Sequence, residues 1–135
     1  MPQPQLSTLD HFVLTVASIP DTLAFYEDIL GMRRDFFTTA QGEQRWALLF
    51  GQMKINLHEA GREFEPKARH PTAGSGDLCF LTDAPLQAWV DHFNSRNVAI
   101  EAGPVRRTGA RAALMSLYVR DPDGNLVEVS EALHD

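Results

Sequence analysis

The order strand, helix, strand, strand, strand occurs twice along this chain of 135 residues, and this repeat is the feature that most constrains the fold. Each predicted helix begins at a Ser-x-Pro or Asp-x-Pro sequence, at residues 18–20 and 83–85. Ser and Asp are favoured helix caps, and Pro fits the first helical turn because the N–H that it lacks has no partner there. Identity between the two halves is low, so the repeat is one of architecture and not of sequence.

In the first half, alternating and β-branched residues indicate strands, and the helical spacing of Leu23, Tyr26 and Leu30 indicates one helix. Ser18 is expected to cap this helix and Gly31 to end it. The expected elements are a strand at 9–16, a helix at 18–32 and strands at 33–38, 44–50 and 53–59.

In the second half, Asp83 is expected to cap a helix with an apolar face formed by Leu86, Trp89, Val90 and Phe93. The sequence DPDGN after residue 120 is typical of a hairpin turn. It superficially resembles a calcium loop, but it lacks the remaining ligand positions. The expected elements are a polar linker at 61–76, a strand at 77–82, the helix, a short strand at 98–102, a loop at 103–111 and strands at 112–120 and 126–132.

Composition narrows the classes of function. With a net charge of −6 and no run of more than two basic residues, the chain lacks the clustered basic face that nucleic acid requires. No apolar stretch is long enough to span a membrane, and the first residues lack the pattern of a secretion signal. The single cysteine, Cys79, lies in an apolar run, so we expect a buried structural thiol in a cytoplasmic protein.

Strand parity determines where the polar residues inside the strands point. Side chains alternate between the two faces of a sheet, so Val127 and Val129 are expected to face the helices and Glu128 the opposite face. A buried carboxylate there needs a cation, which a metal or Arg120 would supply. The same parity places four more polar residues on helix-free faces, namely His11, Asn56, His58 and Asp77.

Some of these polar residues also have a plain structural explanation. His11 would hydrogen-bond locally at a strand end, and Asp77 would cap the preceding GSG turn. His58 has three candidate roles: a metal ligand, a general base or a contact to substrate. We expect a base or a substrate contact, because imidazole titrates near neutral pH.

Three arginines, Arg107, Arg111 and Arg120, are expected near the rim of such a face. Each is either a solvated charge or a clamp for a substrate carboxylate or phosphate, and Arg120 is the strongest candidate for a clamp. Three aromatic side chains would either line the site or pack within the sheets: Trp46, Phe50 and Tyr118.

Three segments together carry a resemblance to a known family: LDHFVLTVASIPDTLAFYEDILGM near the start, GDLCFLT midway and YVRDPDGNLVEV near the end. With them the chain resembles the vicinal-oxygen-chelate superfamily of glyoxalases, bleomycin-resistance proteins and extradiol dioxygenases, over about residues 7–132. The segments INLHEAG, FEPKARHP and GPVRRTGA are similar to the glyoxalase-domain-containing-protein-5 group and its bacterial virulence-associated relatives.

The resemblance implies a single α+β domain over 1–135, with paired βαβββ modules at about 7–60 and 77–132 joined by the linker at 61–76. In this superfamily the modules form an eight-stranded, cup-shaped mixed sheet with helices on the outer face. A divalent metal lies in the cup and binds substrate oxygens directly. The resemblance also implies a homodimer, since open half-sheets leave edges that commonly pair.

The resemblance further implies a ligand set, in which His11, Asp77 and Glu128 bind the metal. Asn56 stands where glyoxalase I-like members carry a carboxylate, and an amide is a poor ligand for zinc or nickel. We therefore expect three protein ligands, with Asn56 as a substrate contact. One imidazole and two carboxylates favour manganese, iron or magnesium over zinc, and nickel also stays open.

These expectations converge on a divalent-metal-dependent enzyme acting on a small molecule, with lyase, isomerase or dioxygenase chemistry. Dioxygenase chemistry ranks lower because its usual pair of histidines is incomplete here. The main alternative is a metal-free protein that sequesters a small molecule, and a scaffold domain without a site is a third. The expected catalytic residues are His58 and Glu128. The expected substrate-binding residues are Arg120, Arg107, Tyr118 and Asn56.

Overall fold

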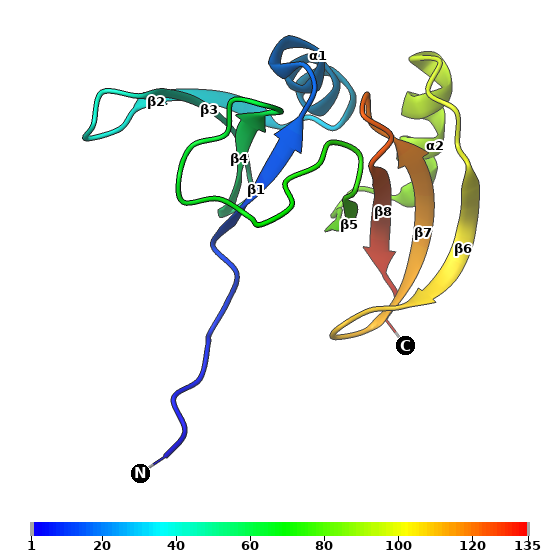
Figure 1. The fold of residues 1–135 in the computed structure, drawn as a ribbon. Coiled ribbons are helices and arrows are strands. Elements are labelled where there is room, and N and C mark those ends of the chain that lie inside the picture. Colours follow the sequence, from blue (N-terminus) through cyan, green and yellow to red (C-terminus); the bar gives the residue numbers. More distant parts are fainter. Residues whose placement is uncertain (1, 135) are drawn as a thin grey trace. The chain divides into compact units, whose positions relative to one another are not determined.

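The computed structural model describes residues 2–134 and divides into two compact units, Met1–Ala68 and Arg69–Asp135, here called unit 1 and unit 2. Each unit carries one mixed four-stranded sheet and a helical segment between its first two strands, as the ribbon in Figure 1 shows. The expected α+β class and the two βαβββ modules are therefore confirmed.

In unit 1, residues 2–10 are exposed and form neither helix nor strand, and the sheet follows them. The strand order is β1-β4-β3-β2, in which β1 runs parallel to β4 and the other neighbours are antiparallel. Its elements are β1 (His11–Val16), α1 (Ile19–Ala24), the π-helical turn η1 (Phe25–Ile29), β2 (Arg33–Thr38), β3 (Gln44–Phe50) and β4 (Met53–Glu59).

The helical segment of unit 1 begins and ends where the sequence predicts. The hydroxyl of Ser18 accepts a hydrogen bond from the backbone N–H of Asp21 at 3.2 Å, which satisfies one of the free donors of the first turn. The segment ends before Gly31, which adopts a positive φ of 77° that side chains rarely tolerate. Between these ends the α-helix passes into a π-helical turn, which the spacing of apolar residues does not predict.

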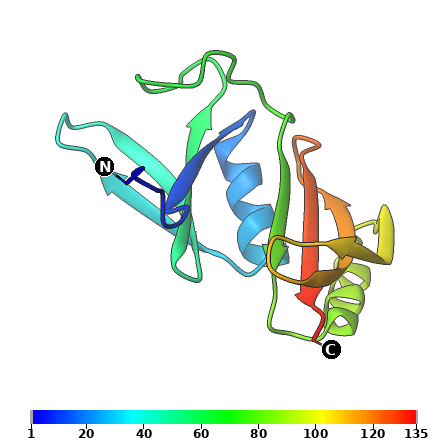
Figure 2. The same cartoon turned by 90° about the horizontal axis from the view of Figure 1, so that it is seen from below.

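The core of unit 1 lies between α1 and one face of the sheet, and Figure 2 gives a second view of these elements. Ile55 and Leu57 are buried on this face, as the alternation in β4 predicts. Leu14 pairs with Leu57 in register and is buried with it, while Asn56 and His58 alternate to the opposite face. The helix-free face of the sheet therefore carries the polar residues.

Unit 2 repeats the arrangement with the strand order β5-β8-β7-β6, in which β5 is parallel to β8. Its elements are β5 (Asp77–Leu81), α2 (Leu86–Ser95), β6 (Ala102–Thr108), β7 (Ala113–Arg120) and β8 (Leu126–Ala132). Among the described residues, none of the helices combines the length and the apolar character needed to cross a membrane.

Two expectations for unit 2 are wrong. Asp83 does not cap α2, because the helix starts later, at Leu86, with Pro85 as its N-terminal cap residue. The carboxylate of Glu131 on β8 instead accepts the N–H of Leu86 at 3.1 Å. The stretch expected as a loop at 103–111 also contains most of β6, and its Gly103-Pro104 sequence lies in an irregularity of the pairing with β7. Proline is tolerated there because β6 is an edge strand.

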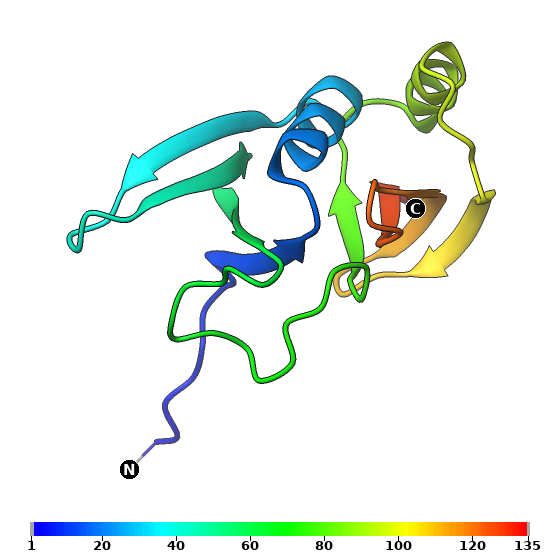
Figure 3. The same cartoon turned by 45° about the horizontal axis from the view of Figure 1, so that its top comes forward.

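The core of unit 2 lies between α2 and one face of its sheet (Figure 3). Phe93 of α2 and the side chains of Leu117 and Val127 have no exposed surface. Val129 is also buried, so both valines that flank Glu128 face the helix, as parity predicts. Glu128 consequently lies on the helix-free face of this sheet.

Candidate functional site

Glu128 is held in place by two buried serines of its own sheet. Its Oε2 accepts hydrogen bonds from the hydroxyls of Ser116, at 2.7 Å, and Ser130, at 3.2 Å. Neither serine has any exposed surface. Both serine hydrogen bonds end on Oε2, and the thiol of Cys79 also interacts with the carboxylate. Oε2 is thus fixed by two hydroxyls.

Arg120 does not supply the cation that Glu128 was expected to need. Its guanidinium donates two hydrogen bonds to Glu101, at 3.0 and 2.9 Å, and a third to the carbonyl of Gly124 at 3.1 Å. This ion pair raises the pKa of Arg120 and lowers the pKa of Glu101. The sequence did not indicate this pairing. Glu101 was expected inside a short strand at 98–102, whereas in the structure it directly precedes β6.

Asp77 lies on the same face as Glu128 but is not its neighbour across the sheet. In the parallel register Asp77 pairs with Leu126, while Cys79 pairs with Glu128. Asp77 is exposed, and its carboxylate makes no hydrogen bond within the described residues. The N–H of Gly76 is bound by Asn125 at 2.7 Å, so nothing supports a role for Asp77 as a cap of the preceding turn.

Cys79 was expected to be a buried structural thiol, and this expectation is wrong. The residue is exposed, because it alternates onto the helix-free face together with Glu128. Its sulfur lies 3.3 Å from the hydroxyl oxygen of Ser130, and partial burial of the sulfur raises the pKa of the thiol. Cys79 therefore belongs to the polar group around Glu128.

Arg107 and Tyr118 form a second polar pair on the sheet of unit 2. Nε of Arg107 donates a hydrogen bond to the hydroxyl of Tyr118 at 2.9 Å, and the guanidinium lies 5.4 Å from the centre of the ring. Tyr118 pairs with Glu128 in the antiparallel register. The two predicted substrate-binding residues thus lie beside each other, with Tyr118 next to Glu128 on the neighbouring strand.

In unit 1, His11 stands at the start of β1 and is exposed. Its Nδ1 lies 2.7 Å from Oδ2 of Asp10, so the local hydrogen bond considered for a strand end is present. Nε2 has no hydrogen-bond partner among the described residues. A histidine that ligates a metal commonly gives its other ring nitrogen to a carboxylate, and this arrangement also fits that role.

Asn56 and His58 share one face of β4, as the sequence predicts. Oδ1 of Asn56 is buried and lacks a hydrogen-bond partner among the described residues. The side chain of His58 is 4% exposed. Burial, and secondarily the charge of Arg45, lowers the pKa of His58 from its ordinary value of 6.5. The imidazole is therefore neutral at pH 7 and able to accept a proton.

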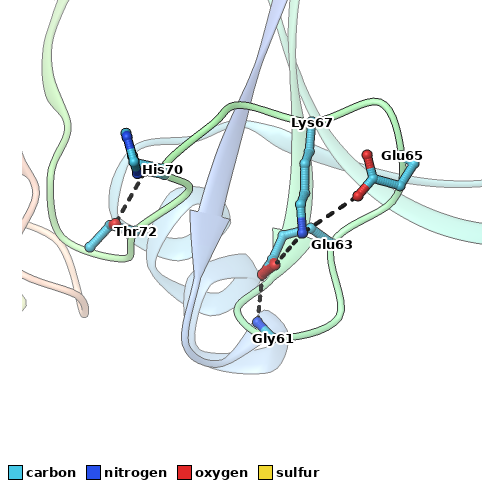
Figure 4. A network of polar contacts seen from close by, with 6 residues as sticks. All are labelled: Gly61, Glu63, Glu65, Lys67, His70 and Thr72. Atoms are coloured by element: carbon cyan, nitrogen blue, oxygen red, sulfur yellow. Dashed lines mark hydrogen bonds and ion pairs between the residues drawn. The ribbon is translucent and has the colours of Figure 1, made fainter.

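Phe64 packs beside His58 and is fixed by the loop that follows β4. The two rings meet edge to face with centres 5.5 Å apart, and the guanidinium of Arg45 lies 4.2 Å from the centre of the Phe64 ring. Glu63 shapes this loop, because its carboxylate accepts the N–H of Gly61 and lies 3.8 Å from Nζ of Lys67, as Figure 4 shows.

Unit 1 also contains a pocket of about 650 Å³. Trp46 and Phe36 form part of its wall, with ring centres 4.4 Å apart, and Leu57 lies in the lining too. These residues pair across the sheet and belong to its helix side. The lining does not include His11, Asn56 or His58, but it includes Arg45 and Phe64, and Phe64 packs against His58.

The structure thus brings the predicted residues together in two groups. Unit 1 carries His11, Asn56 and His58 on one face, and unit 2 carries Asp77, Tyr118 and Glu128 on one face. Within neither unit do three or more His, Cys, Asp or Glu side chains of the described residues form a group that could hold a metal ion. The sequence reasoning missed Ser116, although the alternation of β7 places it on the face of Tyr118.

Comparisons with known proteins place this chain among characterised folds. A family model described as the Glyoxalase/Bleomycin resistance protein/Dioxygenase superfamily matches residues 8–129. The virulence protein STM3117 of Salmonella typhimurium is 48% identical over 126 residues, which are 93% of this chain and 85% of that protein. Its crystal structure has a TM-score of 0.88 and covers 96% of this chain and 100% of its own.

Two further relatives also match most of this chain. The glyoxalase domain-containing protein RDO1 of Mycosarcoma maydis is 46% identical over 130 residues, 95% of this chain and 71% of that protein. A lactoylglutathione lyase of Haemophilus influenzae is more distant, with 29% identity over 128 residues and 90% of each chain covered.

Members of this superfamily often bind divalent metal ions. A fosfomycin resistance protein of Listeria monocytogenes, solved in complex with Mn(II), has a TM-score of 0.62 and 18% identity, and it covers 93% of this chain and 90% of its own. Identity this low shows the shared fold alone.

Proposed function

The chain belongs to the Glyoxalase/Bleomycin resistance protein/Dioxygenase superfamily, and from this premise we propose that it is a divalent-metal-dependent enzyme. Its substrate is a small molecule with two adjacent oxygens, and its reaction is of the lyase or isomerase type. Dioxygenase chemistry ranks lower because the ligand set contains one histidine.

The observation that carries this proposal is the environment of Glu128. The half-buried carboxylate shares its face of the sheet with Ser116, Ser130 and Cys79, and the two serine hydroxyls bind its Oε2. A half-buried carboxylate without an oppositely charged partner is costly unless a cation or a donor from a ligand completes it. Since Arg120 is committed to Glu101, a bound cation is the simplest completion.

The donor groups fit a divalent metal. The ligands that the family resemblance implies are Nε2 of His11 and carboxylate oxygens of Asp77 and Glu128, of which Asp77 and Glu128 lie on one face of the sheet of unit 2. The Asp10–His11 hydrogen bond supports this assignment, because it fixes the ring and leaves Nε2 as the free nitrogen. One nitrogen and two hard oxygens suit manganese, iron or magnesium better than zinc. A bound metal of this kind would act as a Lewis acid on substrate oxygens.

The remaining roles fall to other residues on the helix-free faces of the two units. His58, which is neutral at pH 7, serves as the general base that takes a proton from substrate. The unpartnered Oδ1 of Asn56 accepts a hydrogen bond from a substrate hydroxyl. Arg107 and Tyr118 bind a polar group of the substrate, since both present donors beside Glu128. Arg120 takes part only if its ion pair with Glu101 opens.

The test is the metal content of the purified protein, measured by inductively coupled plasma mass spectrometry, together with Mn²⁺ binding followed by electron paramagnetic resonance. We expect about one ion per chain in the wild type, because a site with three protein ligands and open positions holds a single ion. The ion should be lost in His11→Ala and in Glu128→Gln. His134→Ala and Asp91→Asn are matched controls at exposed positions and should retain it. Metal stoichiometry that is unchanged in both ligand variants would remove the basis of the proposal.

A second candidate function is the binding of an apolar small molecule without a metal. The pocket of unit 1 favours it, since a volume of about 650 Å³ and aromatic walls suit a ligand of that kind. Trp46 and Trp89 are the two tryptophans of the chain, so Trp89→Phe makes Trp46 the sole tryptophan reporter of this pocket. Quenching of its fluorescence by a small aromatic probe such as 1-naphthol, together with an absence of bound metal, would favour this candidate over the enzyme.

A further inference from the structure

Ser116, Ser130 and Cys79 form a chain of polar groups that ends on Glu128. The hydroxyl oxygens of the two serines lie 2.7 Å apart, and Ser116 lies 2.7 Å from Oε2 of the carboxylate. The sulfur of Cys79 lies 3.3 Å from the oxygen of Ser130. The two serines pair in register across β7 and β8, and Cys79 pairs with Glu128 across β5 and β8. Four groups from three strands are thus joined on one face of the sheet.

Counting the available hydrogens indicates which of these side chains donate hydrogen bonds to the carboxylate. Each hydroxyl and the thiol carries one hydrogen, while an ionised carboxylate only accepts. Ser116 therefore donates to Oε2 of Glu128, and the hydrogen of Ser130 lies between Oε2 and the oxygen of Ser116. The thiol of Cys79 lies within hydrogen-bonding distance of Ser130 and also interacts with the carboxylate. Both serine hydroxyls lie on the side of Oε2.

We propose that Ser116 and Ser130 are positioning residues. Their hydroxyls occupy Oε2 of Glu128, so that the carboxylate binds the metal through Oε1 alone. This inference rests on the proposed function, in which Glu128 binds a metal. The serines suit the role because they are rigidly placed: both are completely buried and both belong to central strands of the sheet. A side chain whose second oxygen is fixed in this way cannot rotate to chelate a cation with both oxygens.

Binding through a single oxygen affects which cation is accepted. Calcium takes six to eight oxygens at long distances and commonly uses a carboxylate through both of its oxygens. Magnesium and other smaller cations accept one oxygen from each carboxylate within a compact set of ligands. The serine pair therefore favours manganese or magnesium over calcium at this site.

Four variants test the inference: Ser116→Ala, Ser130→Ala, the double variant and Ser130→Thr. The alanine variants remove only a hydroxyl, and Ser130→Thr keeps one. Ser95→Ala is the control, since Ser95 lies on α2 and its hydroxyl bonds only to the carbonyl of His92. Each variant is compared with the wild type for its thermal midpoint and for its affinity for Mn²⁺ and Ca²⁺, added as chlorides. The single variants each keep one hydroxyl on Oε2. Their affinities for Mn²⁺ and Ca²⁺ therefore test the inference even where the double variant does not fold.

We expect the double variant to bind Mn²⁺ roughly 10- to 100-fold more weakly, the range found when groups that orient metal ligands are removed. The ratio of Mn²⁺ to Ca²⁺ affinity should fall with it, and Ser130→Thr should restore part of the loss relative to Ser130→Ala. The separation between the two carboxylate stretches of Glu128 in the infrared spectrum, isolated by difference against Glu128→Gln, should narrow in the double variant. A general loss of stability would not produce that spectral change.

Other results would overturn the inference in distinguishable ways. If the wild type binds Mn²⁺ but the serine variants bind it equally well, with an unchanged infrared separation, the serines do not position Glu128 and the proposed function survives. If the wild type binds no Mn²⁺ at all, the proposed function fails and the positioning role fails with it.

Discussion

Nδ1 of His11 lies 2.7 Å from Oδ2 of Asp10, so a carboxylate next to the ring holds one nitrogen at the start of β1. Asp10 therefore determines which nitrogen of His11 is free, and it fixes the orientation of the ring. We predict that Asp10→Asn weakens Mn²⁺ binding about tenfold while leaving the thermal midpoint close to that of the wild type, because removing such a partner typically costs 10- to 100-fold in metal affinity.

The control for Asp10→Asn is Asp91→Asn, which removes the same charge from an exposed position on α2. Isothermal titration with MnCl₂ gives both affinities at one ionic strength. An equal loss of affinity in the two variants would mean that only the net charge matters, and the orienting role of Asp10 would be wrong.

The pH dependence of stability should report the burial of His58. Its pKa is lowered below 6.5 in the folded state by burial and by the charge of Arg45, while the nearby carboxylates of Glu63 and Glu43 partly oppose the shift. In the pH range between that lowered pKa and 6.5 the unfolded chain binds more protons than the folded one. The contribution of the neutral imidazole to stability is therefore fully present above pH 6.5 and is lost as the pH falls through the lowered value.

We predict that urea unfolding measured from pH 8 to pH 5 gives a free energy of unfolding that falls less steeply in His58→Gln than in the wild type. His70→Gln, at an exposed position, should keep the slope of the wild type. Identical slopes in the wild type and in His58→Gln would show that the ring titrates alike in the folded and unfolded states.

The strands and their faces were predictable because burial imposes a period of two on each strand. The bounds of β2, β3, β4 and β8 agree with the expected ranges, and Val127 and Val129 face the helix as parity requires. Parity also put Glu128 on the opposite face. It could not reveal the serine hydroxyls on Oε2, because a hydrogen bond depends on the register between β7 and β8 and not on the alternation within either strand.

Three expectations failed for physical reasons that can be identified. Asp83 fitted the local rule for a helix cap, but the N–H of Leu86 was satisfied by Glu131 from a strand 45 residues away in sequence. Residues 103–108 look like a loop because of Gly and Pro, yet the edge position of β6 tolerates both. Cys79 has apolar neighbours in sequence, but it alternates onto the open face. The helix cap and β6 were thus decided by partners distant in sequence, whereas Cys79 was decided by the alternation within β5.

The helix-side core of unit 2 should dominate its stability. Leu117 on β7 is completely buried, and α2 packs against that strand. We predict that Leu117→Ala lowers the free energy of unfolding by about 2–5 kcal/mol, as expected for a leucine replaced in a packed core. Leu81→Ala is the matched control, because Leu81 is 67% exposed, and its effect on urea unfolding should be small. Similar losses in the two variants would contradict the assignment of the core to the helix side.

The turn between β7 and β8 is fastened by Asn125, which has no exposed surface. Its Nδ2 donates to Oδ2 of Asp121 at 2.8 Å, and its Oδ1 accepts the N–H of Gly76 at 2.7 Å. Gly76 directly precedes β5, so one side chain ties the turn to the start of a parallel strand. Oδ1 of Asp121 in turn accepts the backbone N–H groups of Asp123 and Asn125. The DPDGN sequence is therefore a hairpin turn, as expected, and its first carboxylate is used to close it.

We predict that Asn125→Ala lowers the free energy of unfolding by about 2–4 kcal/mol, because it removes two hydrogen bonds and leaves the buried partner groups unsatisfied. Asn94→Ala, at an exposed position on α2, is the control and should have little effect on urea unfolding. Addition of CaCl₂ should not shift the thermal midpoint through this turn, because backbone N–H groups already occupy Oδ1 of Asp121 and Asn125 occupies Oδ2. A calcium-dependent rise of the midpoint that disappears in Asp121→Asn would show that the turn binds calcium after all.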